Sequence, residues 1–184
     1  MRLVAIFAAL CCMSTLTLAQ SAKPRVILLH PGAHSADTEA IVIPAGSPMR
    51  LVSFPRDFES NAAFRGHFTL SGDYELSGYG DDAVTTLWPD RRSRSVLPYW
   101  RDRGGPHEIY ISNAWAFAQA VVPKNKLQTM KANKLPSVRG HVTIIADDYK
   151  TSIECDVASF SARFVSVVKP AVRIAANPKS EEGC

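Results

Sequence analysis

Residues 90–103, with the sequence DRRSRSVLPYWRDR, contain the densest group of side chains in this chain that could bind a ligand. Arginine carries a planar fork of donors that fits phosphate, sulfate and carboxylate groups, and aromatic rings stack on bases or sugar rings. The pattern therefore predicts a binding loop for an anionic ligand. We expect its contacts to come from Arg91, Arg92, Arg94, Tyr99, Trp100, Arg101 and Arg103. In the alternative interpretation the loop is solvated, Asp90 and Asp102 pair with arginines, and Trp100 folds into the edge of the core.

A second group of possible ligands is the polar stretch HPGAHSADTE at residues 30–39. Imidazole and carboxylate groups together suit zinc, and here they would come from His30, His34, Asp37 and Glu39. However, Pro31 followed by glycine breaks the helix that would place both histidines on one face. We therefore expect a polar loop at this position, with no metal and no cofactor.

Two stretches echo each other, RGHFTLSGDYELS at residues 65–77 and RGHVTIIADDYKTS at residues 139–152. Each places a histidine, His67 or His141, at its third position. If the two segments were neighbours, these histidines could act as acid and base together with nearby carboxylates. The candidate carboxylates are Asp73, Asp147 and Asp148. The alternative is a pair of exposed histidines without a catalytic role, because no nucleophile motif accompanies them.

Both echoes alternate apolar and polar residues, which is typical of a half-buried strand. In the first echo, one face carries Phe64, Gly66, Phe68, Leu70, Gly72 and Tyr74. In the second echo, the corresponding face carries Val138, Gly140, Val142 and Ile144. We expect a turn at residues 147–149, a hairpin partner at 151–157 and a last strand at 160–168.

Shorter strands are predicted by runs of β-branched residues at 25–29, 40–43, 83–88 and 108–112, and the rest of residues 81–107 is expected to be loop. Residues 115–122, WAFAQAVV, are ambiguous. Their alternation predicts a strand, which we favour because Pro123 ends the segment, whereas the alanines and a cap at Asn113 favour a helix. Apolar residues at helical spacing predict a short helix at 124–134.

Strands outnumber helices in this prediction, so we expect an all-β or β-rich fold. Its centre would be a small antiparallel β-barrel at residues 62–168 with one short helix. The order of the elements resembles an OB-like barrel, in which a helix lies between the third and fourth strands. Residues 20–61 would be an extended N-terminal segment with short strands, and residues 169–184 would be a C-terminal tail.

Residues 1–19 have the pattern of a signal peptide, with a basic start, an apolar run and small residues at the end. We therefore expect a secreted or periplasmic protein. Cleavage leaves Cys155 and Cys184, which we expect to form a disulfide that ties the tail to the domain. The closed loop of about 29 residues would contribute roughly 3.5 kcal/mol in the chain-entropy model. The alternative is two free thiols.

The composition, with 46% hydrophobic and 21% charged residues and a net charge of +4, is that of one mildly basic globular domain. We predict an exported, non-enzymatic binding or interaction protein whose partner is an anionic envelope polymer or a protein. Export disfavours nucleic acid, and no segment after the signal peptide is long enough to span a membrane. One alternative is a hydrolase or metal-dependent enzyme that uses the His and Asp residues. Another is a docking module anchored by Trp88, Trp100 and Trp115.

Overall fold

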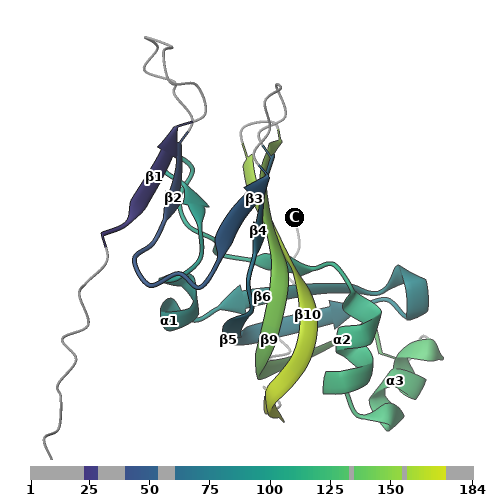
Figure 1. Ribbon diagram of the computed structural model, residues 1–184. Coiled ribbons are helices and arrows are strands. Elements are labelled where there is room, and N and C mark those ends of the chain that lie inside the picture. The colour runs from purple at the N-terminus through teal and green to yellow at the C-terminus, as the bar shows by residue number, and fades with distance from the viewer. Residues whose placement is uncertain (1–22, 29–39, 54–60, 133–134, 155–156, 173–184) are drawn as a thin grey trace, which may run out of the picture.

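The computed structural model describes residues 23–28, 40–53, 61–132, 135–154 and 157–172, which form a β-rich fold (Figure 1). The strands are β1 (Arg25–Leu28), β2 (Ala40–Ile43), β3 (Arg50–Ser53), β4 (Asn61–Arg65), β5 (Phe68–Ser77), β6 (Val84–Pro89), β7 (Tyr99–Trp100), β8 (Ile109–Ile111), β9 (Ser137–Glu154) and β10 (Val157–Val172). The helices are α1 (Arg91–Arg94), α2 (Ala114–Val121) and α3 (Lys124–Lys131), with one 3₁₀ turn at Gly80–Asp82. The predicted β-rich class is confirmed. The expectation of one short helix is wrong, because the described part of the chain contains three α-helices.

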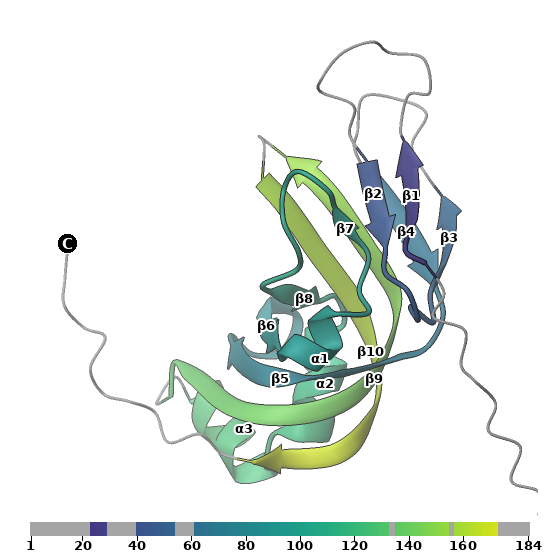
Figure 2. The same cartoon turned by 90° about the vertical axis from the view of Figure 1, so that its left-hand side faces the viewer.

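Five strands form a closed ring of hydrogen-bonded neighbours in the order β5, β6, β8, β10, β9 and back to β5. Every pair in this ring is antiparallel except β8 with β10, which is parallel at Tyr110 and Ile111. The expected purely antiparallel arrangement therefore fails at this pair. Strands β9 and β10 are long and curved and extend beyond the ring, where β9 also pairs with β4 (Figures 1 and 2).

A second sheet contains β1, β2 and β7. Its third strand lies inside the arginine-rich segment, where Trp100 pairs with Ile41 and Tyr99 pairs with Val42. The amide of Arg101 adds a hydrogen bond of 2.8 Å to the carbonyl of Ala40. The prediction that residues 90–103 are all loop is therefore wrong, because this segment contains α1 and β7.

The alternation of apolar and polar residues in the two echoes correctly predicts which of their side chains are buried. Phe68, Leu70 and Tyr74 of β5 and Val142 and Ile144 of β9 are all at most 3% exposed. Helix α2 packs against the same core through one ring, since Phe117 makes edge contacts with Tyr74 at 5.2 Å and with Phe164 at 5.6 Å between ring centroids. Edge-to-face contacts of this kind stabilise a core beyond the area that they bury.

Residues 115–122 form most of helix α2 and not the strand that their alternation predicted. The buried residues of α2 are Ala114, Phe117, Ala118 and Val121, which is the spacing of one helical face. The strong helix preference of alanine prevailed over a chance alternation with period two. The helix predicted at 124–134 is confirmed over Lys124–Lys131 as α3. Within the described ranges, no helix combines the length and hydropathy needed to cross a bilayer.

The turn expected at residues 147–149 is also wrong, because β9 continues through it and pairs with β10 on both sides. The register of the two strands shifts here by one residue, and Asp148 takes a φ of 46°. Arg163 of β10 binds both carboxylates, with Nη2 2.7 Å from Asp147 and Nε 3.1 Å from Asp148. A β-bulge of this kind bends a strand, and short polar residues tolerate its backbone. Of the residues expected to return as a hairpin partner, 151–154 instead continue β9, and β10, which begins at Val157, is the partner strand.

Candidate functional site

The two echo strands lie side by side, which the sequence could not decide. Strand β5 pairs with β9 over its whole length, and Asp73 lies directly opposite His141. Two residues earlier along β5, Ser71 lies opposite Thr143. Since alternate residues of paired strands share a face, these four polar side chains lie together on the outer face of the ring.

His141 is the centre of a hydrogen-bonded group on this face. Its Nδ1 lies 2.8 Å from Oδ1 of Asp73, and its Nε2 lies 3.4 Å from Oγ of Ser71. The hydroxyl of Thr143 donates to Ser71 Oγ at 3.1 Å. The side chains of His141 and Asp73 are 43% and 57% exposed, so the group is open to solvent.

Helix α1 is fastened to β5 beside this group. Asp90 caps the helix by accepting a hydrogen bond of 2.7 Å from the amide of Ser93. The amide of Asp90 donates to the carbonyl of Ser71 at 2.8 Å, and the amide of Ser71 donates to the buried hydroxyl of Ser93 at 2.9 Å. Both backbone groups of Ser71 are therefore bound to α1, which fixes the position of its side chain.

Gly72 makes this close approach of the strands possible. A Cβ atom at this position would lie 2.1 Å from the carbonyl oxygen of Trp88 and 2.8 Å from Cα of Pro89, so no other residue fits without a shift of the backbone. The contact brings the end of β6 against β5. It therefore brings the start of α1 to the polar face of β5.

The carboxylate of Asp90 is tuned by the same neighbours. Partial burial acts to raise its pKa, but hydrogen bonds from Ser93 and Ser71 and the charge of His141 outweigh burial and lower the pKa below its ordinary value. Asp90 is therefore ionised at neutral pH. It places a fixed negative charge at the edge of the polar group.

A cleft of about 530 Å³ lies between α1, the two echo strands and the end of β10. Its polar wall includes the hydroxyls of Thr69, Ser71, Ser93 and Thr143 and the carboxylate of Asp90. Two cations from distant parts of the chain, Arg92 and Lys169, also line it and outnumber this single carboxylate. Lys169 pairs across the strands with Thr143, so it belongs to the same rigid sheet as the echo strands. We take this cleft as the candidate functional site.

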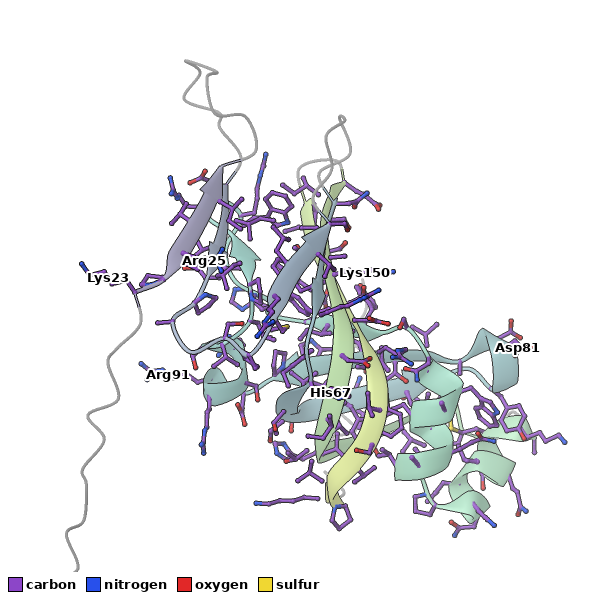
Figure 3. All side chains as sticks on the ribbon, in the orientation of Figure 1. Lys23, Arg25, His67, Asp81, Arg91 and Lys150 are labelled. Carbon is purple, nitrogen blue, oxygen red and sulfur yellow. The ribbon has the colours of Figure 1, made fainter. Side chains whose placement is uncertain are left out.

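The predicted binding segment contributes to two places and not to one loop. Arg92 lines the cleft, and Arg91 points away from the body of the protein in Figure 3. Arg94 donates to Nδ1 of His107 at 3.3 Å. Arg103 and His107 line a second cavity of about 390 Å³. Arg101, two residues before Arg103, is exposed.

Between these places the segment passes through the core. Leu97 is fully buried and Trp100 is 1% exposed, while Tyr99 is half-buried against the core. The prediction that Trp100 contacts a ligand is therefore wrong, because its ring is covered by protein. The alternative, in which Trp100 folds into the core, describes its position correctly.

His67 does not join His141. It lies between β4 and β5, six residues before Asp73, which corresponds to roughly 20 Å along an extended strand. Asp147 and Asp148 serve Arg163 at the bulge. Of the acid–base residues proposed from the echoes, the structure brings together only Asp73 and His141.

Five polar residues of the cleft were not selected from the sequence, namely Thr69, Ser71, Ser93, Thr143 and Lys169. Ser71 and Thr143 carried a usable signal, because aligning the echoes as antiparallel neighbours places both beside the Asp73–His141 pair. Ser93 and Lys169 carried none, since only the packing of α1 and the β9–β10 register brings them there.

The candidate tryptophan anchors also differ in position. Trp88 is 40% exposed on β6, whereas Trp115 is partly buried and lies 4.6 Å from Tyr79 between ring centroids. Tyr110 on the neighbouring strand β8 is 43% exposed. Trp88 is thus the most exposed of the three tryptophans.

Several predictions concern residues outside the described ranges. These are the signal peptide at 1–19, the group His30, His34, Asp37 and Glu39, and the cysteines Cys155 and Cys184. Among the residues that the structure does describe, no cluster of three or more His, Cys, Asp or Glu side chains could hold a metal ion.

Comparison with known proteins found no matching family model, no matching curated protein and no matching solved structure. The argument for function therefore depends on the chemistry of the site.

Proposed function

We propose that the chain is an exported binding protein that holds an anionic polymer in the cleft beside α1. One observation carries the proposal. Arg92 and Lys169, which are far apart in the sequence, line one cavity together with four hydroxyl groups and the single carboxylate of Asp90. Guanidinium and ammonium groups bind phosphate, sulfate or carboxylate, and hydroxyls can donate to the remaining oxygens.

The ring of strands supports an OB-like interpretation as part of this proposal. Numbered from β5, the ring joins its third strand β8 to its fifth strand β10, and helices α2 and α3 fall between the third and fourth strands. OB-like barrels bind oligosaccharides and oligonucleotides on their outer face and loops. The cleft lies on the outer face, and the exposed Arg91, next to Arg92 on α1, extends the surface that a polymer would contact.

The cellular context of this proposal is a secreted or periplasmic compartment. A protein that meets envelope polymers there would lose residues 1–19 and gain the Cys155–Cys184 disulfide. The polymer would be an acidic glycan or a related envelope polyanion. A protein partner docked through Trp88 is the competing form of the binding proposal.

Binding to dextran sulfate, with neutral dextran as the comparison, tests the cleft. The double variant Arg92→Ala, Lys169→Ala should weaken binding roughly tenfold, because each cation contributes about 0.7 kcal/mol at a partly exposed site. The matched control is Lys124→Ala, Lys126→Ala on α3, which removes the same charge from another part of the surface. A third variant, Arg101→Ala, Arg103→Ala, tests whether the polymer reaches the second cavity.

The affinity of the wild-type protein should fall as salt rises, because contacts to a polyanion release counterions. The cleft variant should show a shallower salt dependence than the α3 control. Equal losses in the cleft and α3 variants would mean that net charge alone attracts the polymer, and the proposed site would be wrong. Binding that does not change with salt would exclude a polyanion as the ligand.

A further inference from the structure

We infer that Ser71, His141 and Asp73 form a nucleophile, base and orienting carboxylate that cleave an acyl ester bearing an anionic group. The inference rests on the proposed function for its substrate class, because the anionic group would occupy the same cleft. It adds an activity that binding alone does not require.

The hydrogen bonds of His141 have the order that such a set needs. Nδ1–H donates to Asp73 at 2.8 Å, which holds the imidazole in the tautomer with a free electron pair on Nε2. That nitrogen faces Ser71 Oγ at 3.4 Å. This distance is longer than a strong hydrogen bond, and nucleophile–base contacts are often loose before substrate binds.

The surroundings of Ser71 direct its proton toward His141 or Asp90. Thr143 donates to Ser71 Oγ at 3.1 Å, so the hydroxyl of Ser71 must find an acceptor elsewhere. Asp90 is the competing acceptor, because Ser71 contributes a hydrogen bond that lowers the pKa of this carboxylate. A bound substrate that draws Ser71 toward the reacting carbon would decide between the two acceptors.

The cleft gives a substrate access to this hydroxyl. Ser71 lines the cavity of about 530 Å³ in which Arg92 and Lys169 supply positive charge. These cations can hold the anionic part of the ester and lower the energy of the negative charge that develops on its carbonyl oxygen. The three reacting residues lie on paired strands, which hold them more rigidly than loops would.

The reaction balances with water as the only co-reactant. Ser71 Oγ attacks the carbonyl carbon, and its proton moves to Nε2 of His141. The ester bond then breaks, the alcohol leaves with that proton, and an acyl group remains on Ser71. Water attacks the acyl group and gives a proton to His141, which returns it to Ser71 as the free acid departs.

The other explanation of the same contacts is a polar ladder on an exposed sheet face. Cross-strand pairs such as Asp73 with His141 stabilise sheets without any chemistry. The adjacent pair of Glu75 with Arg139, at 2.8 Å, is of this kind. The two explanations differ in one respect, since only a nucleophile forms a covalent bond with an electrophile.

The experiment is to treat the full chain with a fluorophosphonate probe and to measure its intact mass and the labelled peptide. We expect one adduct on Ser71, absent in Ser71→Ala and retained in Ser77→Ala, a matched serine on the same strand. His141→Gln and Asp73→Asn should slow labelling by about 100-fold or more, because general-base assistance is worth about that much. An anionic ester, p-nitrophenyl hemisuccinate, should be cleaved faster than p-nitrophenyl acetate, and Ser71→Ala should abolish the difference.

The result that overturns the inference is a folded wild-type protein that gives no adduct, or an adduct that Ser71→Ala retains. Dextran sulfate binding and probe labelling of the wild-type protein, measured beside its unfolding midpoint, separate the two proposals. Binding without labelling would leave the proposed function intact and remove the triad. Labelling of Ser71 without polymer binding would support the triad and refute the polymer.

Discussion

Tyr149 ties the arginine-rich segment to the sheet, and we expect its hydroxyl to matter more for stability than that of any surface tyrosine. The residue is fully buried on β9 and donates a hydrogen bond of 2.8 Å to the carbonyl of Pro98, between α1 and β7. Tyr149→Phe keeps the ring and removes this bond. A buried acceptor that loses its partner costs about 1–3 kcal/mol. We therefore expect a loss of about 2 kcal/mol, or roughly 4–8 °C in melting temperature for a domain of this size.

Urea unfolding followed by tryptophan fluorescence measures this loss, and Tyr110→Phe is the matched control. Tyr110 is exposed and donates to Glu108 at 3.3 Å, so its change should stay within about 0.5 kcal/mol. The midpoint of Tyr149→Phe should fall with an unchanged slope. If the two variants shift equally, the hydrogen bond to Pro98 does not hold the segment, and the reasoning from this bond is refuted.

The burial of Tyr149 also predicts that the stability of the protein depends on pH. Burial raises the pKa of Tyr149 well above its ordinary value of 10.0, so the neutral form is favoured in the folded protein. The corresponding stability is fully present below pH 10 and is lost as pH rises toward the folded pKa, because the unfolded chain ionises first. Tyr149→Phe should lack this part of the alkaline loss. If the stability of wild type and of Tyr149→Phe falls equally above pH 10, ionisation of the buried Tyr149 does not cause the loss.

The remaining predictions concern the cap of α1 and the termini. Asp90→Ala should cost about 1 kcal/mol at pH 7 through loss of the bond to Ser93, measured by urea unfolding. The pKa of Asp90 is lowered in the folded protein, so the stability that depends on its charge is present above the ordinary value of 3.8 and is lost as pH falls below it. The difference in stability between Asp90→Ala and wild type should therefore shrink in acid. A difference that is the same at pH 7 and pH 3 would argue against a charged cap. Protein recovered from the exported fraction should begin near Gln20, and an unprocessed chain would contradict export. Its intact mass should be two hydrogen atoms below that of the reduced chain, and a fully reduced chain would contradict the Cys155–Cys184 bridge.

The sequence by itself determined which residues of the strands face the core. Phe68, Leu70 and Tyr74 were predicted to share a face, and the structure buries all three. Alternation succeeds here because side chains of a strand must point to opposite faces, whatever the strand pairs with. The short helix at α3 was also predicted, since apolar residues at helical spacing have a similarly local cause.

Prediction from the local sequence failed where the same residue pattern fits two kinds of secondary structure. Residues 115–122 satisfy both a strand and a helix, and only the position of Phe117 between Tyr74 and Phe164 shows which was adopted. Asp147 and Asp148 satisfy both a turn and a bulge, and the deciding contact comes from Arg163, which lies on another strand. In each case the choice depends on a partner that the local sequence does not contain.

The candidate site required the tertiary structure altogether. The sequence grouped His141 with Asp73 only on the condition that the two echo strands were neighbours, and it gave no reason to add Arg92. The register of β5 with β9 places Ser71 and Asp73 beside His141, and the packing of α1 adds Arg92. A sequence determines which side chains are available and which face of a strand carries them. Strand register and helix packing are set by contacts between distant segments, so only the folded chain determines which of those side chains meet.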